Sequence, residues 1–258
     1  LVDPDAIHNA INSRTVGIMP TQLNGRTCNM ESIVRLAEKY KLFIVEDAAQ
    51  ALGSRFKGKA AGTFGTASAI SFYPAKTLGS LGDAGAVVTN DFDLYNKIYQ
   101  LHDHGRNPEG EVKSWGRNSR LDNLQAAILN YKLEEYNKTI ERRRYIAGMY
   151  QSKLNILEEL KLPPEPTLCG DHYDVYQNYE LEAEQRDGLK MYLKTHGVST
   201  LIQWGGKGIH QWENLGLTKS LPKVEKFFEK CLMLPMNTFL SDADIEYICN
   251  QVINFYRS

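Results

Sequence analysis

Three side chains with chemical potential stand at or just behind two strand-like segments. Asp47 closely follows the apolar run Leu42 to Val45, Ser71 ends a second strand-like run, and Lys76 comes five residues later. A carboxylate can neutralise a protonated ring nitrogen, a hydroxyl can hydrogen-bond a phosphate, and a lysine can form an imine with an aldehyde. On adjacent strand ends, the three groups together can hold one flat, phosphorylated ring that bears an aldehyde.

This set of groups is what a protein contributes to pyridoxal 5'-phosphate (PLP) chemistry, in which the cofactor stores electrons and the protein orients it. The amine of Lys76 must be partly unprotonated to attack a carbonyl, and a desolvated cleft would lower its pKa. The residues alone leave other roles open. The alternatives are a surface position for Lys76, a helix-capping role for Asp47, and a bond from the hydroxyl of Ser71 to a backbone carbonyl.

Alternating strand and helix signals in the first half predict a mostly parallel sheet flanked by helices. The expected strands are Leu42 to Glu46, covered on both faces, Ala67 to Phe72 and Gly85 to Thr89. The expected helices are Met30 to Tyr40, capped by Asn29 or Ser32, and Asp91 to Leu101.

The second half predicts a small α+β domain. A long helical pattern, continuous or broken, runs from near Leu121 toward Leu154 and ends before a proline-rich stretch at residues 163–166. The elements expected after it are strands at Val175 to Leu181 and Val198 to Gln203, helices at Arg186 to Thr195 and Lys219 to Lys230, and a terminal helix that Ser241 to Asp244 begin with a capping box.

Five stretches, in one order, make the chain from about Asp3 to its end resemble the DegT/DnrJ/EryC1/StrS family of sugar aminotransferases. They are Ile18 to Arg26, Glu46 to Gly53, Ser71 to Lys76, Gly82 to Ala86 and Asn118 to Ala127. The resemblance implies the α/β fold-type-I architecture of PLP-dependent transferases, which is aspartate-aminotransferase-like. Residues 1–135 would form part of the large PLP-binding domain, with its mostly parallel sheet, and residues 136–258 the linking helix and the small α+β carboxy-terminal domain.

The resemblance also implies roles for individual residues. Lys76 would hold PLP and later shuttle a proton between the substrate carbon and the cofactor, Asp47 would face the ring nitrogen, and Ser71 would bind the phosphate. Gln50 resembles a family glutamine beside the ring, with a surface glutamine as the alternative. Asn118 matches an asparagine that reaches the phosphate in the partner subunit's site, which implies a homodimer with shared active sites. A local turn bond is the alternative for Asn118.

The second half departs from the family's usual pattern. Many relatives carry a His near a Tyr in the stretch that is Val175 to Tyr179 here, and His-Tyr-Pro around the stretch that is Ile202 to Lys207. Trp204, Lys207 and His210 are the candidates for lining a sugar-nucleotide pocket, because aromatic rings stack and cations bind phosphates. The alternatives are a core position for Trp204 and a solvated position for Lys207.

The predicted function is that of a PLP-dependent aminotransferase in polysaccharide or antibiotic biosynthesis. It would convert a keto-sugar linked to a nucleoside diphosphate into an amino sugar, with glutamate as the amino donor. The turn Gly82 to Gly85 resembles members that act at sugar C3 or C2, since members that act at C4 often carry Glu-Gly-Gly there. Two alternatives stay open, namely a keto-cyclitol aminotransferase and a catalytically silent fragment that serves as a binding or assembly module. The second is open because family members carry a further amino-terminal segment that helps to hold the phosphate and the ring.

Composition narrows the class of protein. The 258 residues carry a formal net charge of −1, which gives no general attraction to nucleic acid or to an anionic membrane. No apolar run approaches the roughly 20 residues of a membrane span. The four cysteines form no C-x-x-C pair, and the first residues are not a basic signal-peptide start. We therefore expect a cytoplasmic protein with reduced thiols, without a disulfide framework and without a metal site.

Overall fold

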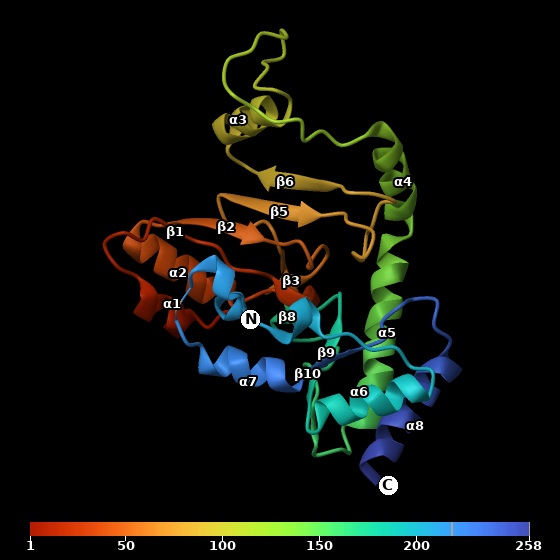
Figure 1. The fold of residues 1–258 in the computed structure, drawn as a ribbon. Helices are drawn as coiled ribbons and strands as arrows, with labels where there is room; N and C mark the ends of the chain where they lie inside the picture. The colour runs from red at the N-terminus through yellow and green to blue at the C-terminus, as the bar shows by residue number, and fades with distance from the viewer. Residues whose placement is uncertain (218, 258) are drawn as a thin grey trace. The chain divides into compact units, whose positions relative to one another are not determined.

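The computed structural model describes residues 1–217 and 219–257, which form two compact units (Figure 1). The first unit contains Leu1–Ile140 and Thr167–Val175, and the second contains Glu141–Pro166 and Tyr176–Ser258. Across the described part of the chain, no helix has both the length and the apolar character needed to span a lipid bilayer.

A four-stranded sheet in the order β1-β2-β5-β6 forms the centre of the first unit (Figure 1). Strands β1 (Gly17–Ile18), β2 (Phe43–Asp47) and β5 (Ala67–Ser71) run parallel, whereas β6 (Gly85–Thr89) is antiparallel to β5. The three strands expected from the sequence are confirmed to within a residue at either end. The sheet is mostly parallel, as predicted, with one antiparallel edge.

Successive side chains of β2 point to opposite faces of this sheet, and the register with β5 shows which residues share a face. Asp47 pairs with Ala69 of β5, and because side chains alternate along a strand, Ser71 lies on the same face as Asp47. Glu46 pairs with Ser68 on the opposite face. The sheet therefore places two of the three candidate PLP residues on one side, at the carboxyl ends of neighbouring strands.

The prediction that β2 is covered on both faces was wrong. On the Ile44 face, the core includes Ile33 and Ala37 of α2 (Met30–Tyr40). On the other face Phe43 is 50% exposed. Within the described residues, the apolar side chains of α2 cover the Ile44 face and leave the Phe43 face open. The face that carries Asp47 is consequently the more open one.

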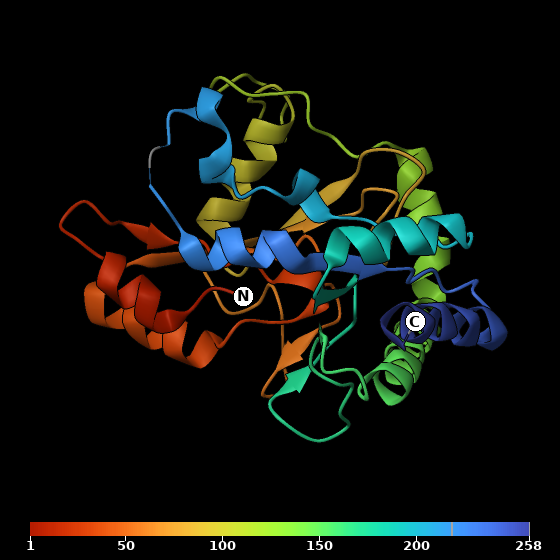
Figure 2. The same cartoon turned by 60° about the horizontal axis from the view of Figure 1, so that its bottom comes forward.

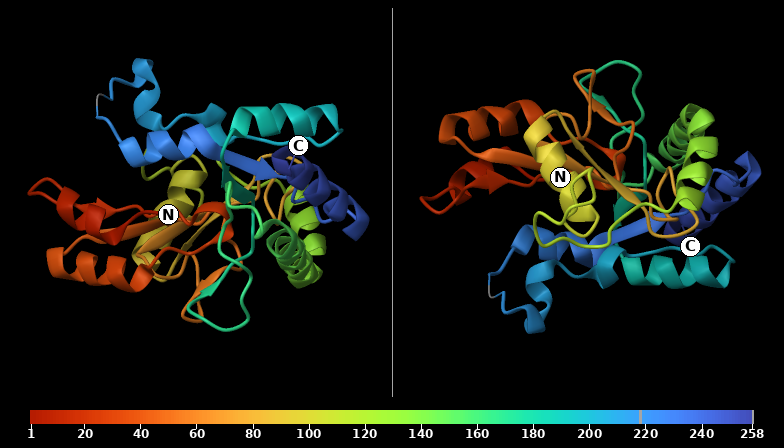
Figure 3. Two further views of the ribbon diagram at one scale, coloured as in Figure 1. Left: turned by 90° about the horizontal axis from the view of Figure 1, so that it is seen from below. Right: turned by 90° about the horizontal axis from the view of Figure 1, so that it is seen from above.

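Local signals explain the helices of the first unit, which are α1 (Pro4–Ala10), α2, α3 (Phe92–His102) and α4 (Asn123–Glu134). The side chain of Asn29 caps α2 by accepting from the backbone N–H of Ser32 at 3.2 Å, as expected. The left panel of Figure 3 shows α1 beside α2, and α3 contacts β6. The expected long helix is broken at Glu135, between α4 and α5 (Tyr136–Leu154).

A second, smaller sheet in the first unit was not expected from the sequence. It is antiparallel, in the order β4-β3-β8, and consists of β4 (Lys59–Ala60), β3 (Arg55–Phe56) and β8 (His172–Tyr173). Strands of two residues are too short to show an alternating pattern. The predicted strand Val175 to Leu181 was wrong at its start, because Tyr176 has a left-handed φ of 49° that interrupts the extended chain.

The second unit has its own antiparallel sheet, in the order β10-β9-β7. Its strands are β7 (Leu160–Lys161), β9 (Tyr179–Ala183) and β10 (Cys231–Leu234), and its helices besides the greater part of α5 are α6 (Arg186–Thr195), α7 (Pro222–Lys230) and α8 (Asp242–Arg257). Figure 2 shows α6 and α8, which contact one another. This is the small α+β arrangement that the sequence predicted.

The start of α8 confirms the predicted capping box. The backbone N–H of Asp244 donates to Ser241 Oγ at 3.1 Å, and the backbone N–H of Ser241 donates to Asp244 Oδ2 at 2.9 Å. The predicted strand Val198 to Gln203 was wrong. Leu201 makes only an isolated bridge to Met233, and the following turn departs from extended geometry with a φ of 47° at Trp204.

Three short 3₁₀ turns follow this bridge in the second unit. They are η2 (Gln203–Gly206), η3 (Ile209–Gln211) and η4 (Glu213–Leu215), and a fourth, η1 (Leu23–Gly25), belongs to the first unit. The turn η1 precedes α2, and the backbone N–H of its Asn24 donates to the side chain of Gln50.

Candidate active site

A cavity of about 610 Å³ lies where β5 ends in the first unit, within the size range of small-molecule sites. Ser71 and Lys76 both line it. The other lining residues are Tyr73, Asp83, Ala84, Gly85, Ser119, Arg120 and Leu121. The structure therefore brings two of the predicted cofactor residues into one cavity.

The loop after β5 folds back tightly to present Lys76. The backbone N–H of Lys76 donates to the carbonyl oxygen of Tyr73 at 2.8 Å, and that of Ser80 donates to Phe72 at 2.8 Å. A Cβ atom at Gly79 would lie 2.5 Å from the carbonyl oxygen of Pro74, so the loop requires glycine there. These contacts fix the backbone on both sides of the lysine.

The electrostatic surroundings favour a reactive amine at Lys76. Partial burial lowers the pKa of Lys76 below its ordinary value, and the nearby carboxylate of Asp47 opposes that shift by favouring the charged form. A lower pKa leaves a larger neutral fraction of the amine at a given pH, and the neutral amine is the nucleophile. Asp47 acts on Lys76 through its charge and is not among the residues that line the cavity.

Asp47 is held by its backbone on both sides. Its N–H donates to the carbonyl oxygen of Pro20 at 3.0 Å, and its carbonyl oxygen accepts from the N–H of Gln22 at 2.9 Å. One carboxylate oxygen, Oδ1, accepts from the N–H of Ala49 at 3.1 Å, which is the local bond that the sequence left open as an alternative. Within the described residues the other oxygen accepts no hydrogen bond, so Asp47 has an acceptor to offer to a ligand.

Ser71 accepts a hydrogen bond from a neighbour in sequence, and Gln50 accepts one from a distant segment. Ser71 Oγ accepts from the N–H of Tyr73 at 3.3 Å, which leaves its own O–H able to donate to a phosphate. Gln50 Oε1 accepts from the N–H of Asn24 at 2.8 Å. Gln50 is thereby tied to the turn η1, and its amide NH₂ is the group it can present to a ligand.

Asn118 does not line the cavity, although the three residues after it do. Its Oδ1 accepts from Arg120 Nε at 3.3 Å, and its backbone pairs in an isolated antiparallel bridge with Asp103. Asn118 is exposed. The sequence assigned no role to Arg120, although it lies inside one of the quoted stretches, and the structure places Arg120 among the residues that line the cavity of Lys76.

The three tentative substrate residues lie in the second unit, whereas Lys76 lies in the first. Trp204 is 59% exposed, so the alternative that it belongs to the core is wrong. Lys207 Nζ lies 5.4 Å from the centroid of the Trp212 ring, and His210 Nε2 lies 3.1 Å from Glu225 Oε1. Their assignment to a substrate pocket stays a prediction.

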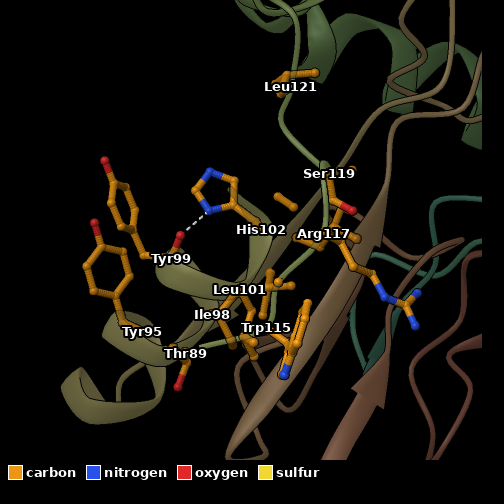
Figure 4. Close-up of a pocket in the computed structure, with 15 residues that line it drawn as sticks. Thr89, Tyr95, Ile98, Tyr99, Leu101, His102, Trp115, Arg117, Ser119 and Leu121 are labelled. Atoms are coloured by element: carbon orange, nitrogen blue, oxygen red, sulfur yellow. Dashed lines mark hydrogen bonds between the residues drawn. The ribbon is translucent and has the colours of Figure 1, made fainter. Parts of the chain in front are cut away.

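A second cavity of about 880 Å³ in the first unit lies beside β6 and α3 (Figure 4). Apolar and aromatic side chains dominate its lining, which contains no lysine and no carboxylate. The ring nitrogen Nδ1 of His102 contacts the carbonyl oxygen of Tyr99 at its margin. The cavity holds none of the predicted site residues, and Gly85, Ser119 and Leu121 line both cavities.

The cysteines are free thiols, and three of them are buried. Burial raises the pKa of Cys231 to about 11 and that of Cys249 to about 12, so both thiols stay protonated and unreactive at neutral pH. Within residues 1–217 and 219–257, no three His, Cys, Asp or Glu side chains are grouped so that they could hold a metal ion.

Comparison with known proteins decides the family. Residues 1–253 match the profile of the DegT/DnrJ/EryC1/StrS aminotransferase family. The chain belongs to this family. A pleiotropic regulatory protein of Geobacillus stearothermophilus is 35% identical, and the UDP-2-acetamido-2-deoxy-3-oxo-D-glucuronate aminotransferase of Pseudomonas aeruginosa is 34% identical; the alignments cover 99% and 98% of this chain, and 69% of each relative.

The solved structures confirm the expected fold. The structure of S. venezuelae DesV superposes with a TM-score of 0.93 at 33% identity, over 100% of this chain and 69% of that one. The α/β fold is therefore that of the PLP-dependent aminotransferases. The family uses PLP, and solved relatives carry it or its amine form.

The residues of this chain fit that cofactor on three observations. The Lys76 amine has a lowered pKa, one oxygen of Asp47 accepts no hydrogen bond within the described residues, and the hydroxyl of Ser71 can donate into the cavity. They are respectively a nucleophile, an anion for a protonated ring nitrogen and a donor for a phosphate.

Proposed function

We propose that this protein is a PLP-dependent aminotransferase that converts a nucleotide-linked keto-sugar into an amino sugar. The observation that carries the proposal is the partly buried Lys76 amine, whose pKa is lowered by desolvation within reach of the Asp47 charge and which shares a cavity with Ser71. Bound PLP supplies an electron sink for the bond changes at the amine-bearing carbon.

Each residue then has a separate task. Lys76 would attach the cofactor through Nζ, and its neutral amine, once released, would hold and return the proton of the reacting carbon. Asp47 places a negative charge against the ring nitrogen and so keeps that nitrogen protonated. Ser71 would donate its O–H to the phosphate, and the amide of Gln50 would lie beside the ring.

The proposed acceptor is a deoxyhexose on a nucleoside diphosphate, aminated at C3 or at C2, with glutamate as donor. The name of the Pseudomonas relative, a 3-oxo sugar aminotransferase, supports this class. The turn Gly82 to Gly85 supports it too, since Asp83 and Gly85 line the cavity of Lys76. Trp204, Lys207 and His210 would contribute to nucleotide binding, and Asn118 would complete the phosphate site of a twin subunit in a homodimer.

A panel of keto acceptors tests the proposal. With glutamate as donor, we expect the complete protein to aminate nucleotide-linked 3-keto or 2-keto sugars, and Lys76→Ala to abolish the reaction. Lys97→Ala is the matched control, because Lys97 is an exposed lysine of α3 outside both cavities. If the protein turned over a keto-cyclitol and no nucleotide sugar, the proposed acceptor would be wrong. Activity in Lys76→Ala would contradict the proposed role of Lys76.

The name of the Geobacillus relative favours a second candidate, a regulatory role that needs no catalysis. The two candidates differ in what Lys76 does. A protein that never attaches PLP at Lys76 and aminates none of the acceptors would support the second candidate. Covalent attachment together with turnover supports the first.

A further inference from the structure

Glu46 buries a carboxylate on the face of β2 opposite Asp47. Its side chain is completely inaccessible to solvent. Oε2 accepts from Gln22 Nε2 at 2.8 Å and from the N–H of Gly62 at 2.8 Å, and Oε1 accepts from the N–H groups of Phe64 at 2.6 Å and Gly65 at 3.0 Å. A buried carboxylate is tolerated when hydrogen-bond donors surround it, and four N–H donors do so here.

Gln22 connects this carboxylate to the backbone of Asp47. Gln22 is also completely buried, and its Oε1 accepts from the N–H of Cys28 at 2.6 Å while its Nε2 donates to Glu46. Its own backbone N–H donates to the carbonyl oxygen of Asp47 at 2.9 Å. One residue therefore bonds the side chain of Glu46 and the main chain of Asp47 at once.

The same segment continues to Gln50. Two residues beyond Gln22, the N–H of Asn24 donates to Gln50 Oε1 at 2.8 Å, from a left-handed backbone with a φ of 56°. The orientation of the Gln50 amide thus depends on the path of residues 22–24. That path is fixed on one side by Gln22 and its bond to Glu46.

The turn on the other side of Glu46 is packed directly against β2. Gly62 has a φ of +85°, and a Cβ atom at Gly65 would lie 2.5 Å from the carbonyl oxygen of Ile44. The turn presents its N–H groups to the carboxylate at close range. The Glu46 carboxylate accepts hydrogen bonds from both this turn and Gln22. The end of β2 is consequently held between them.

We propose that Glu46 and Gln22 are a positioning pair for the cofactor. By fixing the end of β2 and the segment after Gln22, they aim the Asp47 carboxylate at the ring nitrogen of PLP and hold the Gln50 amide beside the ring. The inference rests on the proposed function. Neither residue touches the cofactor, because the side chain of Glu46 points to the far face of the sheet and that of Gln22 bonds to it.

The exchange Glu46→Gln tests the carboxylate without changing its size. An amide offers one oxygen and one NH₂, so whichever way it turns, two of the four buried N–H donors face another donor. We expect the end of β2 to shift as it relieves that conflict. A small misplacement of a catalytic group costs on the order of ten- to a hundredfold in rate.

The readout is the protonation of the cofactor ring. The complete protein is loaded with PLP labelled with ¹⁵N in the ring, and the nitrogen chemical shift is recorded by NMR beside turnover and thermal stability. Asp47→Asn gives the reference for a lost ring-nitrogen partner, and Glu38→Gln, at an exposed glutamate of α2, is the matched control. We expect wild type and Glu38→Gln to agree, and Glu46→Gln to move toward Asp47→Asn with about a tenfold or larger fall in kcat.

A Glu46→Gln protein that is less stable but has the wild-type nitrogen shift would overturn the proposal, since Glu46 would then serve the fold alone. Gln22→Met provides a second variant, because it removes the amide bonds to Glu46, Cys28 and Met30 Sδ and leaves the three backbone donors of Glu46 in place. We expect a smaller shift in the same direction, and an unchanged shift there would equally overturn the proposal. A wild-type protein that binds no PLP at Lys76 would instead contradict the proposed function.

Discussion

The second unit encloses one continuous apolar core, whereas the first unit leaves much of its sheet open around the candidate site. Tyr150, Leu154 and Leu232 are fully buried in the second unit. In the first unit, α3 contains no buried residue and Val87 of β6 is 50% exposed. The apolar core there is divided into two smaller clusters.

The difference shows how the candidate site is built. Its residues are held less by apolar packing than by hydrogen bonds between short segments, such as those from residues 20–24 to Asp47 and Gln50. Open cavities need side chains that are not covered, and precise positions need supporting bonds behind them. The second unit, in contrast, owes its stability to burial of large side chains.

A pair of leucine truncations tests the contrast most strongly. Leu154→Ala removes a fully buried side chain of the second unit and should lower the free energy of unfolding by about 3 kcal/mol. Leu124→Ala, at a position 69% exposed on α4 of the first unit, should change it by less than about 0.5 kcal/mol. Urea unfolding of both variants measures the difference. Equal losses would show that the two regions are packed alike.

Asp47→Asn tests whether the open region is specialised for chemistry. The exchange keeps the size of the side chain and removes its charge, so attachment of PLP at Lys76 should survive while kcat falls about a hundredfold. Thermal stability should change little, since the backbone bonds of Asp47 remain. Near-normal turnover, measured on fully loaded protein, would mean that the carboxylate only caps the turn at Ala49.

The capping box of α8 tests a smaller contribution to the stability of the second unit, that of a single helix end. Ser241→Ala removes the acceptor for the N–H of Asp244 and should cost about 1 kcal/mol in unfolding free energy. Ser152→Ala serves as control, because the Ser152 hydroxyl donates to the carbonyl oxygen of Met149, in the preceding turn of α5, and to no other group among the described residues. A loss in the control as large as that in Ser241→Ala would argue against the cap.

The titration of Lys76 gives the subtlest test. Because desolvation lowers the pKa of Lys76 and Asp47 raises it, removal of the charge in Asp47→Asn should lower that pKa further. Competitive labelling of the amine with acetic anhydride as a function of pH, without added PLP, follows this directly. The midpoint should lie below the ordinary lysine value and move to lower pH in Asp47→Asn. An upward move would contradict the assigned interaction.

Features with local causes were predictable from the sequence. The helices α2 and α6, the Asn29 cap and the capping box of α8 depend on residues within a few positions of one another. The shared cavity of Ser71 and Lys76 was also predictable, because a strand end and the loop behind it are neighbours in sequence.

Features that depend on distant pairing were not predictable. Arg55 of β3 pairs with Tyr173 of β8, which lies far along the chain, and no local sequence pattern predicts this pairing. The role of Glu46 depends on the turn at residues 62–65, which only the fold brings to it. Its one sequence signal was a carboxylate inside an otherwise apolar strand. The strand predicted at Val198 to Gln203 failed because, among the described residues of this segment, Leu201 alone forms a β-bridge, to Met233.

Chemical trapping of the cofactor tests directly whether Lys76 is the residue that attaches PLP. The complete protein is incubated with PLP, reduced with borohydride and digested, and the peptides are mapped by mass spectrometry. We expect a pyridoxyl group on Lys76, lost in Lys76→Ala and unchanged in Lys97→Ala. A pyridoxyl group on Lys57 or Lys59 instead, or an unlabelled Lys76 in protein saturated with PLP, would contradict it.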